Sequence, residues 1–451
     1  MAKKKKEENI NKVEEYSEYP IYSKSIGEIT EEAYIRFGGY ISTSRALPRV
    51  ADGLKISYLR LFHHALTFPL GKLIPTNSLL GKISETHPHS TDGLVGTVSM
   101  FVNSGIFKGY GSFGKTYIDG KSAPPAAPRY TKVSISDVYI KLLGELYKEV
   151  PWKPSPNEAL EPSYIPVPLP LCLMMSERVQ GLAVAIKCDM PNFSAKSMYE
   201  AYINNNPQLL EPNMDLILDK SRSDLNDLWT KGKGKVTYSY HLARQRSDDG
   251  KTEGVLFYGD TGMFTISMKK LQKWIDEGKV TVDNVSDQNG TKLLVSRVPG
   301  ARGITIEDIE KVCEKICYDS TVYSLNVTDG HSAFRIPLYA WLDYTYKNYI
   351  SLITSVNNKK ILQVEHEIRI QEALPYVVDY ILTKNPKADN DEISKALGLD
   401  KEVVSGVMSK PIGYLRKNKD TSERVKELKK RLTELGKFDP ILFTHNVIQE
   451  L

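Results

Sequence analysis

The stretch GYGSFGKTYIDGKSAPPAAPRYT, residues 109–131, is the most informative part of this sequence. Its glycines and prolines exclude a regular helix and predict a loop-rich hairpin region. The stretch ends in Arg129, Tyr130 and Thr131, so a guanidinium group stands next to a phenol. Its first six residues fit G-x-G-x-x-G, but the KTYIDG that follows does not begin an apolar helix, which argues against a dinucleotide site.

Short helices are expected before this stretch, because apolar residues recur there at spacings of three and four. Pro48 should end the first helix, and Ser90 or Thr91 should cap the fourth. Short helices followed by a glycine-rich segment with strand-like stretches suit a helix-turn-helix or winged-helix module. The expected helices cover residues 30–44, 55–67, 78–86, 92–102 and, after the stretch, 136–150.

The rest of the chain changes character twice. Residues 151–336 alternate short strands and helices, with PVPLPLCLMM, KVTYSYHLA and GVLFYG among them, which predicts a separate α+β domain. From residue 338 the pattern is helical, and helices at 344–382 and 421–435 flank a small insert at 384–411. This predicts an antiparallel coiled-coil arm with a small globular helical tip, so the expected fold class is multidomain α+β.

Composition indicates a soluble protein with several cores. The 451 residues are 41% hydrophobic and 25% charged, which allows two to four domains. No window approaches the roughly 18 apolar residues of a membrane span, and the charged start MAKKKKEENIN is not followed by the apolar region of a signal peptide. Four cysteines are too few for a disulfide framework. We therefore expect a cytoplasmic protein, with residues 1–27 as a charged flexible tail.

Positive charge is concentrated in one segment. The net charge is only +5, yet residues 45–132 hold eleven Lys or Arg against four Asp or Glu, an excess of seven. Such a segment is a candidate phosphate-binding surface. On charge alone, a solvated charged face remains the alternative.

Three segments together carry a family resemblance. SRALPRVADGLK (residues 44–55), THPHSTD (86–92) and the stretch at 109–131 resemble, in order and spacing, the core motifs of the A subunits of DNA gyrase and topoisomerase IV. They also resemble the medium subunit of the short phage topoisomerases. GLAV at 181–184 is a weaker match, and its Leu182 stands where the family has an isoleucine that wedges between base pairs. TKGKGKV at 230–236 also resembles a family segment.

The resemblance implies that the chain is part of a type IIA DNA topoisomerase, an isomerase that cuts both DNA strands through 5′-phosphotyrosine links. It implies a winged-helix (CAP-like) breakage-reunion domain at 28–160 and an α/β tower domain at 161–337. The arm at 338–451 would carry the dimerisation contact. The implied partners are double-stranded DNA, a second copy of the chain and a large subunit with ATPase and toprim domains, in the cytoplasm of a bacterium or a phage-infected host.

The resemblance also assigns roles to individual residues. Tyr130 is the implied nucleophile and Arg129 its electrostatic partner, since a free phenol has a pKa of about 10 and needs help to attack a phosphorus. The implied DNA-binding residues are Arg45, Lys55, Arg60, His87, His89 and Leu182. No metal site is expected in this chain. The toprim domain of the partner would hold Mg²⁺ and its ATPase domain would bind ATP, because Asp389 and Asp391 lie in a polar loop and no Walker A loop is present.

The sequence departs from the family pattern at several points. Pro128 precedes the Arg-Tyr pair, Leu59 replaces one of two arginines, and residues 90–92 differ from the usual G-D-S. No β-pinwheel follows the arm in this sequence, so DNA wrapping and active negative supercoiling are not expected.

Other interpretations of individual motifs exist. A DNA-binding scaffold with a degenerate site is the non-enzymatic alternative for the whole chain. The H-x-x-R at 241–244 is found in tyrosine recombinases, but here it follows a strand-like segment and lies after the tyrosine. Cys313 with Cys317, or His87 with His89, could face a metal. The preferred interpretation is buried or inert thiols, and histidines that hydrogen-bond phosphate or simply cap a turn.

Overall fold

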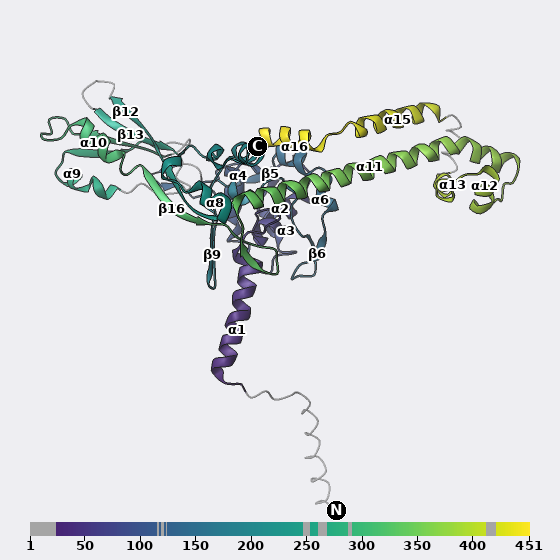
Figure 1. Cartoon of the computed structure of the whole chain (residues 1–451), viewed down its shortest axis with the longest axis horizontal. Helices are drawn as coiled ribbons and strands as arrows, with labels where there is room; N and C mark the ends of the chain where they lie inside the picture. The colour runs from purple at the N-terminus through teal and green to yellow at the C-terminus, as the bar shows by residue number, and fades with distance from the viewer. Residues whose placement is uncertain are drawn as a thin grey trace, which may run out of the picture.

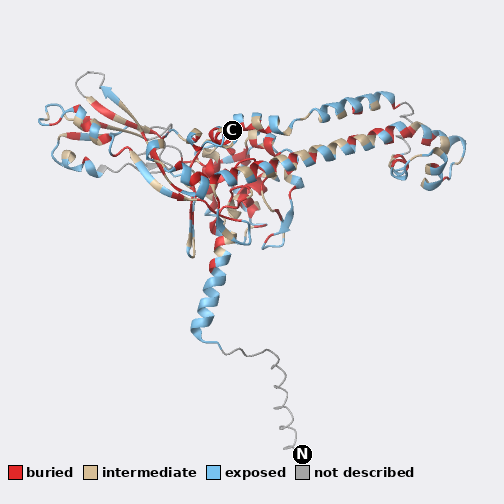
Figure 2. Cartoon of the chain, viewed as in Figure 1, coloured by how far each residue is buried: buried red, intermediate tan, exposed pale blue. Residues whose placement is uncertain are grey.

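The computed structural model describes residues 24–114, 117–118, 121–122, 124–246, 253–259, 268–286, 291–411 and 421–451 (Figure 1). The predicted tail therefore lies outside the described residues up to position 23. Helix α1 (Ile26–Ile41) begins inside the predicted tail, because Ser25 and Glu28 form a reciprocal capping box. The helix is longer than predicted, projects from the body of the molecule and is largely exposed (Figures 1 and 2).

The end of this first helix has an unusual form. It continues into a π-helical turn, η1 (Ser42–Ala46), and the chain becomes extended at Leu47, directly before Pro48. The prediction that Pro48 ends the helix is thus confirmed. The wider π-helical turn carries Arg45 at the surface of the body.

Three helices and a small sheet form the part of the body that surrounds the Arg-Tyr pair. The helices are α2 (Ile56–Leu66), α3 (Thr76–Ile83) and α4 (Leu94–Asn103). The sheet has the order β1-β5-β2, from Ile74–Pro75, Lys132–Ile135 and Phe107–Tyr110. Edge-to-face contacts of Phe62 with Phe101, Phe107 and Tyr139 fill the space between helices and sheet.

Two expectations about these helices were wrong. The helix α4 begins after Gly93 and has no side-chain cap, because Ser90 accepts a hydrogen bond from the Asp92 amide within the preceding turn. The helix expected at 136–150 is split into α5 (Asp137–Leu143) and α6 (Leu146–Glu149). Gly144 interrupts it with a φ of 47°, a backbone conformation that glycine adopts at little cost.

Residues 151–336 contain short hairpins and two larger sheets. A five-stranded sheet has the order β10-β11-β16-β9-β8, and a four-stranded antiparallel sheet has the order β12-β13-β15-β14. KVTYSYHLA forms β11 and the start of β12, as predicted, and GVLFYG lies in β13. PVPLPLCLMM is not a strand: it is buried, irregular chain with a 3-10 turn, η3 (Leu171–Leu173), because its alternating prolines lack amide donors.

The bounds of the remaining strands and helices of this region follow from the structure. The strands are β6 (Trp152–Pro154), β7 (Leu160–Pro162), β8 (Gln180–Ala183), β9 (Ile186–Asp189), β10 (Ile217–Leu218), β11 (Lys233–Ser239), β12 (His241–Arg246), β13 (Glu253–Gly259), β14 (Val280–Asn284), β15 (Thr291–Arg297), β16 (Tyr318–Ser324), β17 (Asn326–Thr328) and β18 (Ala333–Arg335). The helices are α7 (Ala195–Ile203), α8 (Leu225–Lys231), α9 (Gln272–Asp276) and α10 (Ile306–Cys313).

A 46-residue helix, α11 (Leu338–Thr383), forms the arm together with α15 (Ser422–Gly436). The two helices run antiparallel: Thr421 donates to the carbonyl of Gln371 at 2.8 Å, and Asn357 donates to the carbonyl of Leu435 at 3.1 Å. Pro375 lies inside α11 and has no amide proton for the carbonyl four residues earlier, that of Gln371. The Thr421 hydroxyl supplies that donor.

The far end of α11 carries two short helices, where a small helical insert was predicted. The tip consists of α12 (Asn390–Leu397) and α13 (Lys401–Met408), which pack against α11 around Leu374, Val377 and Ile393. The last helix, α16 (Pro440–Glu450), was not foreseen: it returns to the body and packs on α5 and α7 (Figure 1). Among the described helices, none is long and apolar enough to cross a membrane.

Candidate DNA-cleavage site

Tyr130 is presented at the surface by a short turn. The turn is η2 (Pro128–Tyr130), closed by a 2.9 Å hydrogen bond from the Tyr130 amide to the carbonyl of Ala127. The Tyr130 side chain is 65% exposed, and the guanidinium carbon of Arg129 lies 4.7 Å from the centre of its ring. A cation held over a phenol favours negative charge developing nearby.

The backbone on both sides of this turn is fixed. Thr131 donates from its hydroxyl to that of Thr76 at 2.7 Å, and the Thr76 amide donates to the Thr131 carbonyl at 3.0 Å. On the other side, Gly111 has a φ of 107°, and a Cβ there would lie 3.1 Å from the Tyr130 carbonyl oxygen. The glycines of the G-x-G-x-x-G motif therefore let the loop pack against the tyrosine turn. The described residues that come next are two short strands, β3 (Tyr117–Ile118) and β4 (Lys121–Ser122).

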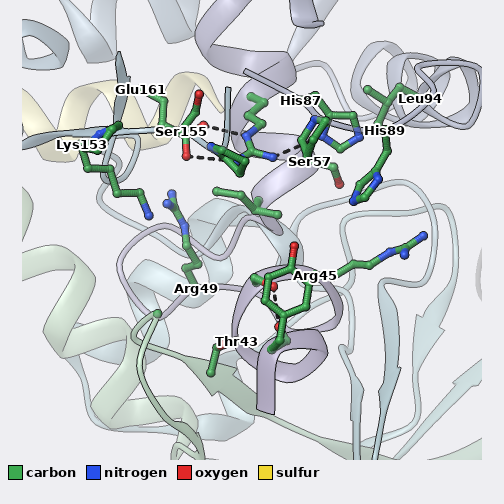
Figure 3. Close-up of a pocket in the computed structure, with 18 of the residues that line it drawn as sticks. Thr43, Arg45, Arg49, Ser57, His87, His89, Leu94, Lys153, Ser155 and Glu161 are labelled. Carbon is green, nitrogen blue, oxygen red and sulfur yellow. Dashed lines mark hydrogen bonds and ion pairs between the residues drawn. The ribbon is translucent and has the colours of Figure 1, made fainter. Parts of the chain in front are cut away.

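A polar groove of about 540 Å³ lies between the π-helical turn, the start of α2 and the H-P-H turn (Figure 3). Four cationic side chains line it, those of Arg45, Arg49, Arg60 and Lys153, together with His87, His89 and one carboxylate, Glu161. The Arg45 side chain is exposed and forms none of the ion pairs found among the described residues. The groove therefore has a net positive lining that suits phosphate oxygens.

His87 is held in its neutral form inside this groove. Its Nδ1 lies 3.4 Å from Nη1 of Arg60, and its ring meets that of His89 edge-on with centroids 5.5 Å apart. Partial burial lowers the pKa of His87 to about 4, with the positive charge of Arg60 as the next cause. At neutral pH His87 is therefore an uncharged ring with one donor and one acceptor nitrogen.

The expected role of Arg60 as a direct phosphate contact needs correction. Arg60 is only 5% exposed, and its Nε and Nη2 donate to the Glu161 carboxylate at 2.6 and 3.2 Å. Its charge is thus already compensated inside the protein. The structure places Arg60 next to His87, with its Nη1 3.4 Å from the imidazole Nδ1.

Lys55 and Leu182 line a second groove, which shares Arg45 with the first. Lys55 donates to the backbone carbonyl of Gln180 at 2.5 Å, and burial lowers the pKa of its ammonium group. Leu182 is 79% exposed in the β8–β9 hairpin, so it is not a core leucine. A Cβ on Gly181 would lie 2.0 Å from the carbonyl oxygen of Ala46, which shows how closely this hairpin packs on the π-helical turn.

The D-G-L-K motif is a structural turn. The Asp52 carboxylate is buried and accepts hydrogen bonds from the amides of Leu54 and Ile165, both at 2.9 Å, while it also pairs with Arg49. Gly53 has a φ of 74°, and a Cβ there would lie 2.8 Å from the Leu171 nitrogen. The motif thus fixes the start of α2 against the body.

The structure brings some of the predicted site residues together and leaves others apart. Arg45, His87 and His89 share one groove, with Arg60 behind them. Among the described residues that line the two grooves, neither Tyr130 nor Arg129 occurs. Lys153 and Glu161, both on the β6–β7 hairpin, were missed: the strand pairing that brings them to the groove has no local sequence motif.

The rival motifs are engaged in structural contacts. Arg244 pairs with Glu310 and Glu307, and the His241 ring stacks on Tyr258 at 4.9 Å. Cys313 and Cys317 are buried and free, and burial raises the pKa of both thiols, that of Cys313 to about 12. Among the described residues, no group of three or more His, Cys, Asp or Glu side chains could hold a metal ion.

This chain is similar to known proteins along most of its length. The family model for the A subunits of DNA gyrase and topoisomerase IV matches residues 45–451. The DNA gyrase A subunit of Treponema pallidum (strain Nichols) is 22% identical over 444 residues, covering 91% of this chain and 54% of that protein. The DNA gyrase A subunit of Brachyspira hyodysenteriae is 23% identical over 335 residues, 66% of this chain and 39% of the relative.

A topoisomerase IV relative matches as well. The A subunit of DNA topoisomerase 4 from Streptococcus pneumoniae serotype 4 is 25% identical over 307 residues, 61% of this chain and 36% of that protein. The chain thus spans about half or less of the length of these relatives. The class that the matches define is the A-type subunits of type II DNA topoisomerases. This chain belongs to the family of DNA gyrase and topoisomerase IV A subunits.

Proposed function

We propose that this chain is the breakage-reunion subunit of a type IIA DNA topoisomerase, which cuts both strands of a duplex and rejoins them. The observation that carries the proposal is the exposed Tyr130 on a turn fixed from both sides, with the Arg129 guanidinium over its ring. Within the proposal, residues 28–160 form the winged-helix breakage-reunion domain. Residues 161–337 form the tower domain, and 338–451 the coiled-coil arm with the dimerisation contact.

The proposed step conserves the phosphodiester. Tyr130 Oη attacks a DNA phosphorus and loses its proton, and the bond from phosphorus to the 3′ oxygen breaks. The 3′ oxygen leaves as a hydroxyl after taking up a proton, and the 5′ phosphate stays bound to the tyrosine. Attack by the same 3′ hydroxyl reverses the step, so rejoining needs no external energy source. Arg129 would stabilise the charge on the phosphoryl oxygens.

The proposed active unit is a homodimer. One tyrosine serves one strand, so cutting both strands takes two copies of the chain, for which a two-fold dimer is the simplest assembly. Because Tyr130 does not line the groove of its own chain, we place the scissile phosphate between Tyr130 of one copy and the Arg45, His87 and His89 groove of the other. Leu182, exposed in its hairpin, is the proposed wedge that bends the duplex.

Mg²⁺ and ATP belong to a separate large subunit in this proposal. The described residues offer no acidic metal site, and no step is assigned to a metal bound by this chain. The toprim and ATPase domains of the large subunit would supply the ion that assists the leaving oxygen and the nucleotide that drives strand passage.

The test is covalent trapping. The chain, a toprim and ATPase partner, supercoiled DNA and Mg²⁺ are mixed and quenched with detergent, and protein-linked DNA is measured. Tyr130→Phe should abolish the adduct, whereas Tyr110→Phe should keep it, because Tyr110 is equally exposed at 65% and lies outside the η2 turn. An adduct that survives Tyr130→Phe removes this residue from its role. Binding without any adduct in the wild type would favour the non-enzymatic DNA-binding scaffold.

Mixed dimers test the shared site. A Tyr130→Phe copy and an Arg45→Gln copy are each deficient on their own, but a mixed dimer retains one intact site if the tyrosine and the groove come from different copies. That dimer should nick one strand. Failure of the mixed dimer to nick, with both homodimers folded, would place the tyrosine and the groove of one site on the same chain.

A further inference from the structure

The β6–β7 hairpin carries a lysine, Lys153, whose cross-strand neighbour Glu161 already forms an ion pair with another residue. Lys153 stands directly opposite Glu161 in the antiparallel pair, and directly opposed residues project from the same face of a hairpin. The carboxylate of Glu161, however, is engaged by Arg60 at 2.6 and 3.2 Å. Lys153 is exposed, and none of the ion pairs found among the described residues includes it.

The ammonium group of Lys153 lies on the groove side of the hairpin. Lys153 lines the same groove as Arg45, His87 and His89, and Figure 3 shows its side chain and that of Arg49 extending toward one another. Arg49 is buried and pairs with Asp52. Desolvation of its ammonium group, and then the charge of Arg49, lowers the pKa of Lys153, although the residue as a whole is exposed. Positive charge at this end of the groove therefore exceeds what the nearby carboxylates compensate.

The hairpin that carries Lys153 is firmly anchored. The Trp152 ring packs on those of His63 and Tyr147, with centroids 5.5 and 5.4 Å apart, and Asn157 donates to the carbonyl of Ser84 at 2.9 Å. A rigid support means that ligand binding orders only the lysine side chain, which limits the entropic cost.

We propose that Lys153 binds a backbone phosphate of duplex DNA, in a subsite that extends the phosphate track from Arg45, His87 and His89 onto the β6–β7 hairpin. This inference rests on the proposed function and adds a contact outside the three sequence motifs that carry the family resemblance. A duplex presents a regular row of phosphates, so one strand can meet both ends of a continuous groove. An acidic surface of a partner protein is the competing occupant, which the experiment distinguishes.

The test measures the affinity of the full-length chain for a duplex between about 50 and 200 mM salt. Each contact between a lysine and a phosphate contributes about 0.9 to the slope of log affinity against log salt, which is about eightfold in affinity at 0.1 M salt. For each copy that contacts the duplex, Lys153→Gln should lower the slope and the affinity by these amounts. Lys153→Arg should retain both.

Two further variants make the result interpretable. Lys273→Gln removes the same charge from α9, which lies far from β6 in Figure 1, and should leave affinity and slope unchanged. Arg45→Gln tests the groove itself. If Arg45→Gln weakens binding and Lys153→Gln does not, the subsite is refuted while the proposed function stands, as the Tyr130 adduct would confirm separately. The affinity of Lys153→Gln for the large subunit is measured as well. If this variant binds duplex DNA as wild type does but binds the large subunit more weakly, the lysine contacts an acidic protein surface and the proposal fails.

Discussion

Replacing Glu161 by glutamine should destabilise the protein strongly, because it leaves the Arg60 charge buried without a counter-charge. The two side chains are 6% and 2% exposed, and their closest atoms lie 2.6 Å apart. Removing one partner of a buried pair costs about 3–5 kcal/mol, whereas exposed pairs contribute at most about 1 kcal/mol. For a domain of about 150–250 residues, each kcal/mol of lost stability lowers the melting temperature by roughly 2–4 °C. The melting temperature of Glu161→Gln should therefore fall by about 6–20 °C.

Urea and thermal unfolding followed by circular dichroism would measure this loss. Glu253→Gln is the matched control, because its pair with Arg246 is exposed and should change the free energy of unfolding by no more than about 1 kcal/mol. Replacing both partners, Arg60→Met with Glu161→Leu, should recover much of the stability, since no buried charge then remains. A Glu161→Gln variant within about 0.5 kcal/mol of wild type, or a double variant less stable than the single one, would refute the reasoning.

Three further predictions concern the histidines and the hairpin. Arg60→Met should raise the pKa of His87 above about 4 by removing the positive charge at 3.4 Å, and imidazole chemical shifts in an NMR titration would show it. An unchanged pKa would mean that burial, with the charges of His89 and Arg45, sets it without Arg60. Burial, and then the charge of His63, lowers the pKa of His64 from 6.5 to about 3, so the folded state binds fewer protons than the unfolded chain. The free energy of unfolding should therefore fall by about 1.4 kcal/mol per pH unit as pH drops below 6.5, and urea midpoints of His64→Gln should lack this component. Gly181→Ala must shift the β8–β9 hairpin, since its Cβ would lie 2.0 Å from the Ala46 carbonyl oxygen, and it should reduce DNA bending measured by energy transfer between duplex ends. Leu182→Ala should reduce bending without loss of protein stability. Normal bending with both variants would exclude Leu182 as the wedge.

Local pattern was enough to predict most of the elements that carry the site. Apolar spacing located α2, α4 and the long arm helix, and Pro48 marked the end of the first helix. Where the local prediction failed, another local signal was responsible. Gly144 broke a helix that apolar spacing alone would continue, and the Ser25 capping box began α1 earlier than its apolar residues indicated.

The features of the site that could not be predicted from the sequence depend on contacts between residues far apart in the chain. Arg60 and Glu161 are 101 positions apart, and nothing in either segment indicates that the arginine is neutralised inside the protein. Lys153 reaches the groove only because β6 and β7 pair in a particular register. Tertiary packing decides whether Tyr130 lines the same groove as Arg45 and His87. The family motifs name all three residues, but they do not show that Tyr130 is absent from the lining of that groove in one chain.

The proline inside α11 has a mechanical consequence for the arm. At most levels of the shaft, main-chain hydrogen bonds within α11 keep neighbouring turns together, but at Pro375 one such link is replaced by the Thr421 hydroxyl of another segment. Nearer the body, Val364 and Ile368 of α11 pack with Leu428 of α15 and hold the two helices together. The tip itself packs on both sides of this proline: Lys410 pairs with Glu367 at 3.3 Å, and Gly406 of α13 lies against Ile370. Helix α13 therefore braces the shaft at the level where the main-chain ladder of α11 has a gap.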